Sequence, residues 1–226
     1  MLKVSNVEVT GFPAAIRGMR NPMNSWDKSD SLTYDDIFVL GDNDLKLMRQ
    51  LAAGGPVHAK YRRFIDVTMD ILAPLYWWKE FDTYRVGVAP NPTDIEMNSC
   101  STMHKIHSKE FELEDFSYEH LSTDESCCYS QIAEELLSPV DTLGIICEVL
   151  NDYRQLYLAS KGKTYWWQMI QLLPTSYNQL RTVHLNYEVV AHIIHDRENH
   201  KLDEWHVLCD KLKQLPYADG VIFNIH

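Results

Sequence analysis

The sequence predicts an α+β protein, because strand-like and helix-like patterns both occur along its 226 residues. Residues 2–10 alternate between apolar and polar side chains, as a β-strand does, and Gly11 and Pro13 end that pattern. Residues 75–88 are rich in aromatic side chains and favour a second strand. Apolar residues recur at helical spacing in residues 42–53 and 130–160. We therefore expect strands combined with long helices.

The first half of the chain combines an irregular segment with two expected helices. Residues 14–36 contain many Asn, Ser and Asp residues and predict irregular structure. Residues 42–53 predict a helix that begins with an Asx cap and ends at Gly54-Gly55-Pro56. Because proline is tolerated in the first helical turn, Pro56 is expected to open a second helix that continues to about residue 73.

The second half of the chain is expected to be mainly helical. Residues 107–127 are acidic and polar, and they predict a solvated connection. A long helix is expected over residues 130–160, and Pro139 should either kink or divide it. Further helices are expected over residues 164–173, 177–199 and 202–215.

Composition limits the possible functions. A net charge of −11 argues against general nucleic-acid binding through a basic surface. No run of about 18 or more apolar residues occurs, so no membrane-spanning helix is expected. Five cysteines, an odd number, fit a reduced cytoplasm, where we expect the protein. With 45% hydrophobic residues, residues 1–226 are expected to form a single domain.

Five residues stand at separations that suggest a ligand site, namely His58, Arg85, Pro174, Asn186 and Arg197. Arg85 comes 27 residues after His58. Arg197 comes 11 residues after Asn186, which corresponds to three turns along one helix face. A guanidinium group stays charged and offers a planar fork of donors suited to phosphate. Two such groups suggest a site for a doubly charged small molecule or a nucleotide cofactor.

Taken with Thr83-Tyr84-Arg85, the run from Asn98 to Met103 and the run from Leu173 to Tyr177, this spacing resembles that of the flavin-dependent thymidylate synthases. The resemblance implies an antiparallel sheet packed with long helices, and a homotetramer with sites between subunits. It implies a methyltransferase in which NADPH reduces FAD and methylenetetrahydrofolate supplies a carbon to dUMP or a related pyrimidine nucleotide. The protein's part would be to position cofactor and base and to stabilise developing charge.

Carried over residue by residue, the resemblance implies two groups of binding residues and leaves the catalytic residues unknown. The flavin would contact His58, Arg85, Asn98 and Asn186. The nucleotide side would be lined by Glu80, Ser101 and Arg197.

The chain also departs from the family pattern. Thr83, Met103 and Ile170 stand where the family has arginine, Glu80 replaces a glutamine, and residues 88–96 form an insertion. Each lost guanidinium removes charge-assisted hydrogen bonds worth about 1.5–3 kcal/mol. Candidate replacement cations are Arg17, Arg20, Arg62, Arg63, Lys79, His104 and Lys105. The losses favour a second hypothesis, a catalytically inactive protein of the same fold that acts as a binding or assembly module.

Several of the candidates also have a purely structural interpretation. Arg85 can pair with Asp82 or Glu80, His58 can pack on a helix face, and residues 98–101 can form an ordinary turn. Glu188, His192 and His195 have helical spacing suited to a metal site. No partner Glu-x-x-His occurs elsewhere in the sequence, and Glu134-Glu135 is the only plausible donor pair, so a polar stripe is favoured and no metal is predicted.

Overall fold

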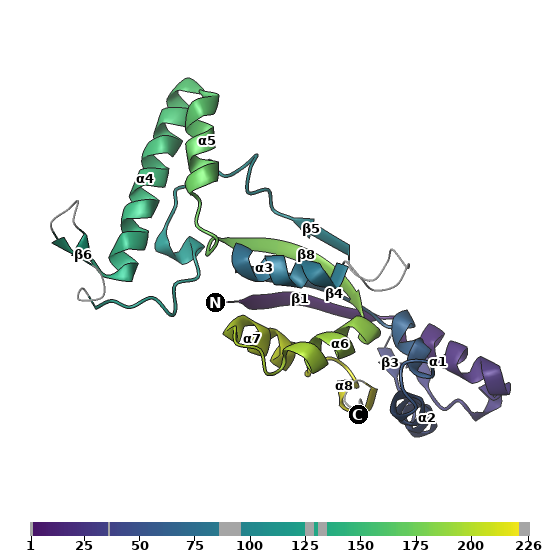
Figure 1. The fold of residues 1–226 in the computed structure, drawn as a ribbon. Coiled ribbons are helices and arrows are strands. Elements are labelled where there is room, and N and C mark those ends of the chain that lie inside the picture. The colour runs from purple at the N-terminus through teal and green to yellow at the C-terminus, as the bar shows by residue number, and fades with distance from the viewer. Residues whose placement is uncertain (1, 36, 86–95, 125–128, 131–134, 222–226) are drawn as a thin grey trace. The chain divides into compact units, whose positions relative to one another are not determined.

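The computed structural model describes residues 2–35, 37–85, 96–124, 129–130 and 135–221 (Figure 1). The chain divides into two compact units. The first, here called the hairpin unit, comprises residues 72–80 and 99–180. The second, here called the sheet unit, comprises residues 2–71, 81–98 and 181–226. The prediction of a single domain over residues 1–226 stays a prediction.

A four-stranded sheet has the order β1–β4–β8–β5. Its strands are β1 (Lys3–Thr10), β4 (Asp66–Pro74), β8 (Asn178–Asn186) and β5 (Glu96–Ser99). Thr68 Oγ1 of β4 lies 3.2 Å from His184 Nδ1 of β8, and Thr182 Oγ1 donates to Asp70 Oδ1 at 2.6 Å. Partner numbers fall along β8 as they rise along β4, so these strands are antiparallel. The α+β class, the antiparallel sheet and the strand expected over residues 2–10 are confirmed.

Residues 66–74 form strand β4, so the helix expected from Pro56 to about residue 73 is wrong. Val67, Met69, Ile71 and Ala73 are buried, whereas the residues between them are half-buried. This period of two belongs to a strand that packs on one face. Among the described residues 56–65, the helical element is the short 3₁₀ helix η3 (Ala59–Phe64).

Residues 178–186 form strand β8, which corrects the single helix expected over residues 177–199. Helix α6 (Tyr187–Arg197) begins only where β8 ends. At this junction, Asn186 Oδ1 accepts hydrogen bonds from the backbone N–H groups of Glu188 at 3.0 Å and Val189 at 3.1 Å. Asn186 is therefore the N-cap of α6 and does not share a helix face with Arg197.

Helix α7 (Asp203–Leu212) falls within the helix expected over residues 202–215, and that prediction is confirmed. It packs against α6 and β1 in the sheet unit. Trp205 and Leu208 are fully buried on its inner face.

Residues 75–81 form helix α3 (Leu75–Phe81), followed by the 3₁₀ turn η4 (Asp82–Arg85), so the strand expected over residues 75–88 is wrong. Residues 86–88 lie outside the described part of the chain. Trp77 and Trp78 are both fully buried, and their ring centroids lie 4.9 Å apart. Aromatic residues favour strands on average, but here burial of the two indoles overrides that preference.

Residues 12–39 are more regular than expected. Helix α1 (Phe12–Arg20) is followed by the 3₁₀ turns η1 (Asn21–Met23) and η2 (Trp26–Lys28) and by the hairpin of β2 (Leu32–Tyr34) and β3 (Ile37–Val39). Gly11, with φ of 93°, precedes α1, and a Cβ there would lie 1.9 Å from the Phe64 carbonyl oxygen. Helix α2 (Asp42–Ala53) has the expected bounds, and α8 (Ala218–Val221) follows α7.

The hairpin unit is named for helices α4 (Pro139–Ser160) and α5 (Lys163–Leu172), which pack against each other. Ser138 caps α4, because its Oγ accepts from the Asp141 N–H at 3.0 Å while Asp141 Oδ2 accepts from the Ser138 N–H at 3.1 Å. Pro139 therefore opens the helix and neither kinks nor divides it. The helix expected over residues 130–160 begins only at Pro139, because the described residues before it form the strands β6 (Tyr129–Ser130) and β7 (Glu135–Leu136). Residues 131–134 lie outside the described part. Helix α5 confirms the helix expected over residues 164–173.

The segment expected to be a solvated connection over residues 107–127 supplies much of the core of the hairpin unit. Phe111 and Phe116 are buried beside Leu143 and Leu150 of α4, and η5 (Leu113–Asp115) lies between them in sequence. The Asn151 side chain accepts from the Phe111 N–H at 2.8 Å and donates to the Phe111 carbonyl at 2.9 Å. Residues 125–127 lie outside the described part.

Across the described residues, no helix combines the length and the apolar character that crossing a membrane requires.

The Ser138 cap gives a first testable prediction. Ser138→Ala should lower the free energy of unfolding by about 1 kcal/mol, because the Asp141 N–H group in the first turn of α4 loses its acceptor. Urea denaturation followed by circular dichroism measures the change. Ser138→Thr keeps the hydroxyl group and should lose less. Equal stabilities of the alanine variant and the parent protein would show that the cap contributes nothing.

Candidate functional site

Arg197 ends α6 and is stacked on aromatic rings of the sheet unit. Its Cζ lies 4.9 Å from the centroid of Trp205 and 5.5 Å from that of Tyr84. Its Nε donates a hydrogen bond to Tyr84 Oη at 2.9 Å. Burial raises the pKa of Tyr84, although the hydrogen bond from Arg197 acts in the opposite direction, so the phenol is neutral near pH 7. The two rings therefore form a platform that orients the guanidinium group.

Arg85 is the last residue of η4 and directly follows Tyr84, which supplies half of that platform. Its side chain lies outside the described part of the structure, so the convergence of Arg85 and Arg197 on one ligand stays a prediction. Asp82 forms an ion pair with Arg181 of β8 at 3.0 Å.

His58 and Asn98 are both exposed in the sheet unit. His58 precedes η3 and packs beside Gly54, where an added Cβ would lie 3.1 Å from His58 Cδ2. Asn98 is on β5 and helps to line a cavity of about 250 Å³, whose other lining residues are Thr68, Met97, Thr182, Val183 and His184. Both side chains are accessible to a ligand, and their flavin contacts stay predictions.

The side-chain oxygen of Asn186 is already used in structural hydrogen bonds. The residue is only 8% exposed, and its side-chain oxygen accepts the two helix N–H groups described above. A ligand can therefore use only its amide nitrogen, a hydrogen-bond donor.

The residues predicted on the nucleotide side include two that belong to the hairpin unit. Ser101 is exposed, and its Oγ accepts from the N–H groups of Met103 at 3.3 Å and His104 at 2.9 Å, so it organises a turn. Glu80 is half-buried near the end of α3. At the positions where the family has arginine, Met103 is 50% exposed and Ile170 packs against the apolar core of this unit.

The possible metal ligands on α6 do not form a common site. Glu188 is buried, whereas His192 and His195 are exposed. His192 Nε2 lies 3.9 Å from Glu188 Oε1, and His195 Nδ1 lies 3.0 Å from Asp196 Oδ1. Among the described residues, no group of three or more His, Cys, Asp or Glu side chains is placed to hold a metal ion.

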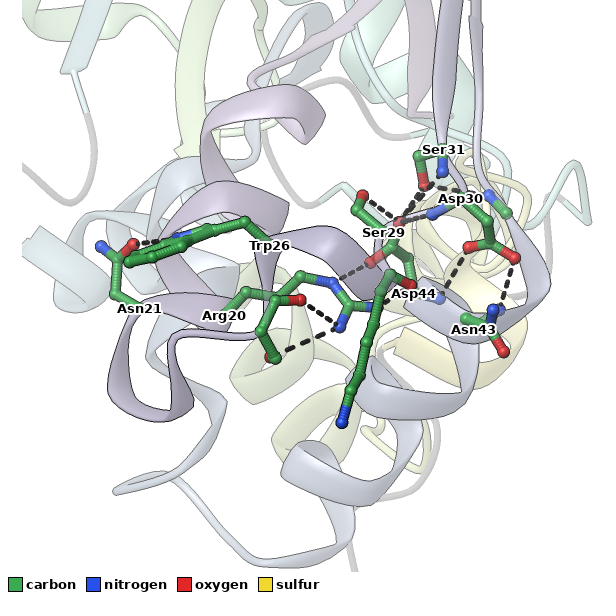
Figure 2. Close-up of polar contacts among 11 residues, drawn as sticks. Arg20, Asn21, Trp26, Ser29, Asp30, Ser31, Asn43 and Asp44 are labelled. Atoms are coloured by element: carbon green, nitrogen blue, oxygen red, sulfur yellow. Dashed lines mark hydrogen bonds and ion pairs between the residues drawn. The ribbon is translucent and has the colours of Figure 1, made fainter.

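The sequence did not predict the buried ion pair between Arg20 and Asp44 in the sheet unit (Figure 2). Arg20 Nε of α1 donates to Asp44 Oδ1 of α2 at 2.6 Å, and the two side chains are 4% and 0% exposed. Asp44 Oδ2 accepts further hydrogen bonds from the hydroxyl groups of Ser29 and Ser31 at 2.7 and 2.6 Å. Although burial by itself raises the pKa of Asp44, the hydrogen bonds from Ser31, Ser29 and Arg20 outweigh it and lower that pKa.

The same network holds the segment from residue 21 to residue 31 in place. Arg20 Nη1 and Nη2 donate to the carbonyl oxygens of Ser25 and Lys28, each at 3.1 Å. Asp30 accepts from the N–H groups of Asn43 at 2.9 Å and Asp44 at 3.2 Å, so α2 is capped by Asp30 and not by an Asx residue at its own start. The abundance of Ser, Asp and Asn that predicted irregular structure was the one available signal for this network.

The network forms one wall of a pocket of about 540 Å³ in the sheet unit. Pro13, Ile16, Arg17 and Arg20 line it from a single face of α1, at helical spacing. The opposite side is lined by Asn21, Trp26, Ser29, Ser31, Thr33 and Phe38. Trp26 is half-exposed and is oriented by a hydrogen bond from its Nε1 to Asn21 Oδ1 at 2.9 Å. The volume and the mainly apolar lining suit a small-molecule site.

Comparison with solved structures identifies known proteins that share the fold of this chain. Neither a family model nor a curated protein matches the chain. Among solved structures, thymidylate synthase X (ThyX) from Helicobacter pylori, with FAD and dUMP, matches with a TM-score of 0.66 and 16% identity over 100% of this chain and 99% of that chain. The UMP/dUMP methylase PolB from Streptomyces cacaoi, bound with 5-Br dUMP, matches with a TM-score of 0.60 and 15% identity over 97% and 91%.

The chain has the fold of the flavin-dependent thymidylate synthases. The expectation about fold drawn from the motif spacing is thus confirmed. Within this fold, Arg197 has a defined aromatic platform, and Asn186 and Ser101 take part in a cap and a turn. Tyr84 and Trp205, which form the platform, were missed because 121 residues separate them in the sequence.

The buried ion pair gives a second prediction. Asp44→Asn should lower the free energy of unfolding at pH 7 by about 3–5 kcal/mol, because it leaves Arg20 charged and unpaired in the interior. The pKa of Asp44 is lowered by folding, so its contribution is complete above the ordinary value of 3.8 and is lost as the pH falls through the folded value. The difference in free energy of unfolding between the parent protein and Asp44→Asn should therefore become smaller below pH 3.8. Urea denaturation at several pH values measures it.

The exposed Asp27 of η2 serves as the matched control, and Asp27→Asn should leave stability nearly unchanged. If Asp44→Asn lowers the free energy of unfolding by the same amount at every pH, the proposed ionisation of Asp44 is contradicted.

Asn186 gives a third prediction, which separates its cap from its predicted contact with flavin. Asn186→Ala should cost about 1 kcal/mol of folding stability. Asn186→Asp keeps an oxygen for the helix N–H groups but removes the amide donor. If the amide nitrogen contacts flavin, the aspartate variant should stay nearly as stable as the parent and retain less FAD. Full FAD retention by this stable variant would remove Asn186 from the cofactor site.

Proposed function

We propose that the protein binds FAD and a pyrimidine nucleotide and methylates the base of that nucleotide, dUMP or a related pyrimidine nucleotide. The observation that carries the proposal is the match over the whole chain to folds whose solved structures hold FAD with dUMP, or 5-Br dUMP, or 5-Br UMP. NADPH and methylenetetrahydrofolate are the proposed co-substrates.

The described donors of the sheet unit are of the kind that a flavin requires. His58 and Asn98 are exposed, Asn186 retains an amide nitrogen, and Arg197 presents a guanidinium group oriented by two aromatic rings. A dinucleotide cofactor carries a charged pyrophosphate and hydrogen-bonding rings, which such donors recognise. The residues present therefore fit the cofactor, and bound FAD would supply the redox chemistry of the reaction.

The residues of the chain would bind and orient. His58, Asn98, Asn186 and Arg85 would hold the flavin in position against the base. Arg197 would approach the nucleotide as a fixed positive charge, because stacking on Tyr84 and Trp205 restricts its rotation. Ser101 would present its hydroxyl group from an organised turn, and Glu80 would accept a hydrogen bond from a base N–H.

Specific observations favour the second candidate, a catalytically inactive binding or assembly module of the same fold. Met103 and Ile170 supply no positive charge, and Ile170 is part of the apolar packing of the hairpin unit. The Ser101 hydroxyl group and the Asn186 oxygen are both used in local structure. A module of this kind would bind nucleotide or flavin without turnover.

We also propose that the protein acts in the cytoplasm as a homotetramer. The hairpin of β2 and β3 carries an exposed apolar face made of Leu32, Tyr34, Ile37 and Val39. These residues pair across the hairpin as Leu32 with Val39 and Tyr34 with Ile37. Large exposed apolar patches are costly in an isolated chain, and contact with another subunit would bury this one.

The fourth prediction tests the function directly. Purified protein should show flavin absorption bands near-stoichiometric to protein, either as isolated or after reconstitution with FAD. With dUMP tritiated at its 5-position, addition of methylenetetrahydrofolate and NADPH should then release tritium. Colourless protein that FAD cannot reconstitute would contradict the enzyme. Flavin or nucleotide binding without tritium release would support the binding module.

The same preparation tests Arg85. Arg85→Ala should reduce the ratio of FAD to protein while the circular dichroism spectrum stays unchanged. Arg49→Ala, at an exposed position on α2, is the matched control and should retain FAD fully. Equal retention by both variants would remove Arg85 from the proposed cofactor site.

A further inference from the structure

Two lysines flank the turn between α4 and α5, and no acidic side chain among the described residues neutralises them. Lys161 follows the last residue of α4 in the left-handed conformation with φ of 55°, and Lys163 is the first residue of α5. Both are exposed, and within the described part of the chain neither forms an ion pair. Each ammonium group instead lies near an aromatic ring, Lys161 Nζ at 5.6 Å from the Tyr157 centroid and Lys163 Nζ at 6.0 Å from that of Trp167.

These lysines open onto a pocket of about 350 Å³ within the hairpin unit. Its lining combines three basic side chains with two aromatic rings: His104, Lys161, Lys163, Tyr157 and Trp166. No described carboxylate lines it, although the whole chain has 32 acidic and only 21 Lys and Arg residues. A concave site with unpaired cations concentrates positive potential and attracts anions.

His107 packs against Tyr157, a lining residue of the pocket, and is subject to the same positive potential. Its ring centroid lies 4.8 Å from that of Tyr157, and its buried Nδ1 has no hydrogen-bond partner among the described residues. Burial lowers the pKa of His107, and the nearby positive charges of Lys161, Lys105 and Arg154 lower it further. These three side chains disfavour a positive charge on His107, so the same positive potential would stabilise a bound anion.

The walls of the pocket are held by hydrogen bonds. Trp166 Nε1 donates to the Met103 carbonyl oxygen at 2.8 Å, which ties α5 to the turn that follows β5. In that turn, Ser101 Oγ accepts from the His104 N–H at 2.9 Å and lies 3.1 Å from His104 Nδ1. His104 is therefore positioned before a ligand arrives, which reduces the entropy lost on binding.

The pocket adjoins the two positions where the family pattern has lost its positive charge. Met103 supplies the carbonyl oxygen that Trp166 binds, and Ile170 follows Trp166 by one helical turn on α5. The cations missing at Met103 and Ile170 are thus present nearby on the α4–α5 turn.

We propose that this pocket binds a phosphate group, with Lys161 and Lys163 supplying the charge and His104 a hydrogen-bond donor. A phosphate near pH 7 carries up to two negative charges, which two ammonium groups match. The assignment of that phosphate to a pyrimidine nucleotide rests on the proposed function; the phosphate site itself does not. The small number of cations and the net charge of −11 argue against a nucleic-acid polymer.

The fifth prediction tests the site with inorganic pyrophosphate as the probe, in isothermal titration calorimetry at low salt. The parent protein should bind it saturably, and Lys161→Gln/Lys163→Gln should weaken binding by about tenfold or more, since each charged hydrogen bond is worth a factor of that order. Lys46→Gln/Lys211→Gln removes two exposed charges of the sheet unit and should bind as the parent does. Lys161→Arg/Lys163→Arg keeps both charges and should retain most of the affinity.

Nuclear magnetic resonance of the imidazole groups gives an independent measurement. Pyrophosphate should shift the His104 resonances and raise the pKa of His107, because the bound anion offsets the field of Lys161. No saturable binding to the parent, or equal affinity in the glutamine and control pairs, would overturn the proposal.

Two further ligands distinguish the source of the phosphate. If the site takes a nucleotide, the glutamine pair should weaken binding of dUMP and leave binding of deoxyuridine, which has no phosphate, unchanged. If dUMP binding is unaffected while pyrophosphate binding is lost, the site serves a different phosphate ligand. Failure of flavin binding or tritium release with pyrophosphate binding intact would contradict the proposed function alone.

Discussion

The buried carboxylate of Asp44 is the constraint on which the N-terminal part of the sheet unit depends. A charge removed from water must be matched by donors, and Asp44 obtains them from Arg20, Ser29 and Ser31. Those donors come from a helix and from a loop that would otherwise have little reason to adopt one conformation. Satisfying one carboxylate therefore joins α1 to α2, arranges the segment between them and shapes the wall of the 540 Å³ pocket.

Cations resting on aromatic faces recur in both units. In the sheet unit, Arg197 is stacked on Tyr84 and Trp205. In the hairpin unit, Lys161 and Lys163 lie near Tyr157 and Trp167. An aromatic face stabilises a cation without neutralising it, so the charge remains able to attract an anionic ligand. Lys161 and Lys163 form no ion pair within the described part of the chain, so in a protein with a net charge of −11 they preserve a local positive potential that carboxylate partners would cancel.

The match to the fold at 16% identity shows which features of the family pattern can change while the architecture is kept. Ile170 shows this directly, because an apolar residue at a position that the family gives to arginine packs into the core of the hairpin unit. Asn186 shows the opposite case, because its side chain caps α6 and so has a structural role apart from any ligand. Retained spacing is therefore better evidence for the fold than for the chemistry of the site.

The sequence by itself determined the fold family through motif spacing, and it determined the elements whose periodicity is unambiguous, β1, α2, α5 and α7. It also contained the alternation of β4, at Val67, Met69 and Ile71, but Pro56, which is tolerated in a first helical turn, favoured a helix there. Only the tertiary structure decided that residues 75–81 are helical and that residues 178–186 are a strand. It alone brought Tyr84, Arg197 and Trp205 together, and Trp166 to Met103. The physical reason is that local propensities differ by only about 1 kcal/mol, whereas burying a large apolar side chain is worth about 1.5–3 kcal/mol and depends on partners distant in the chain.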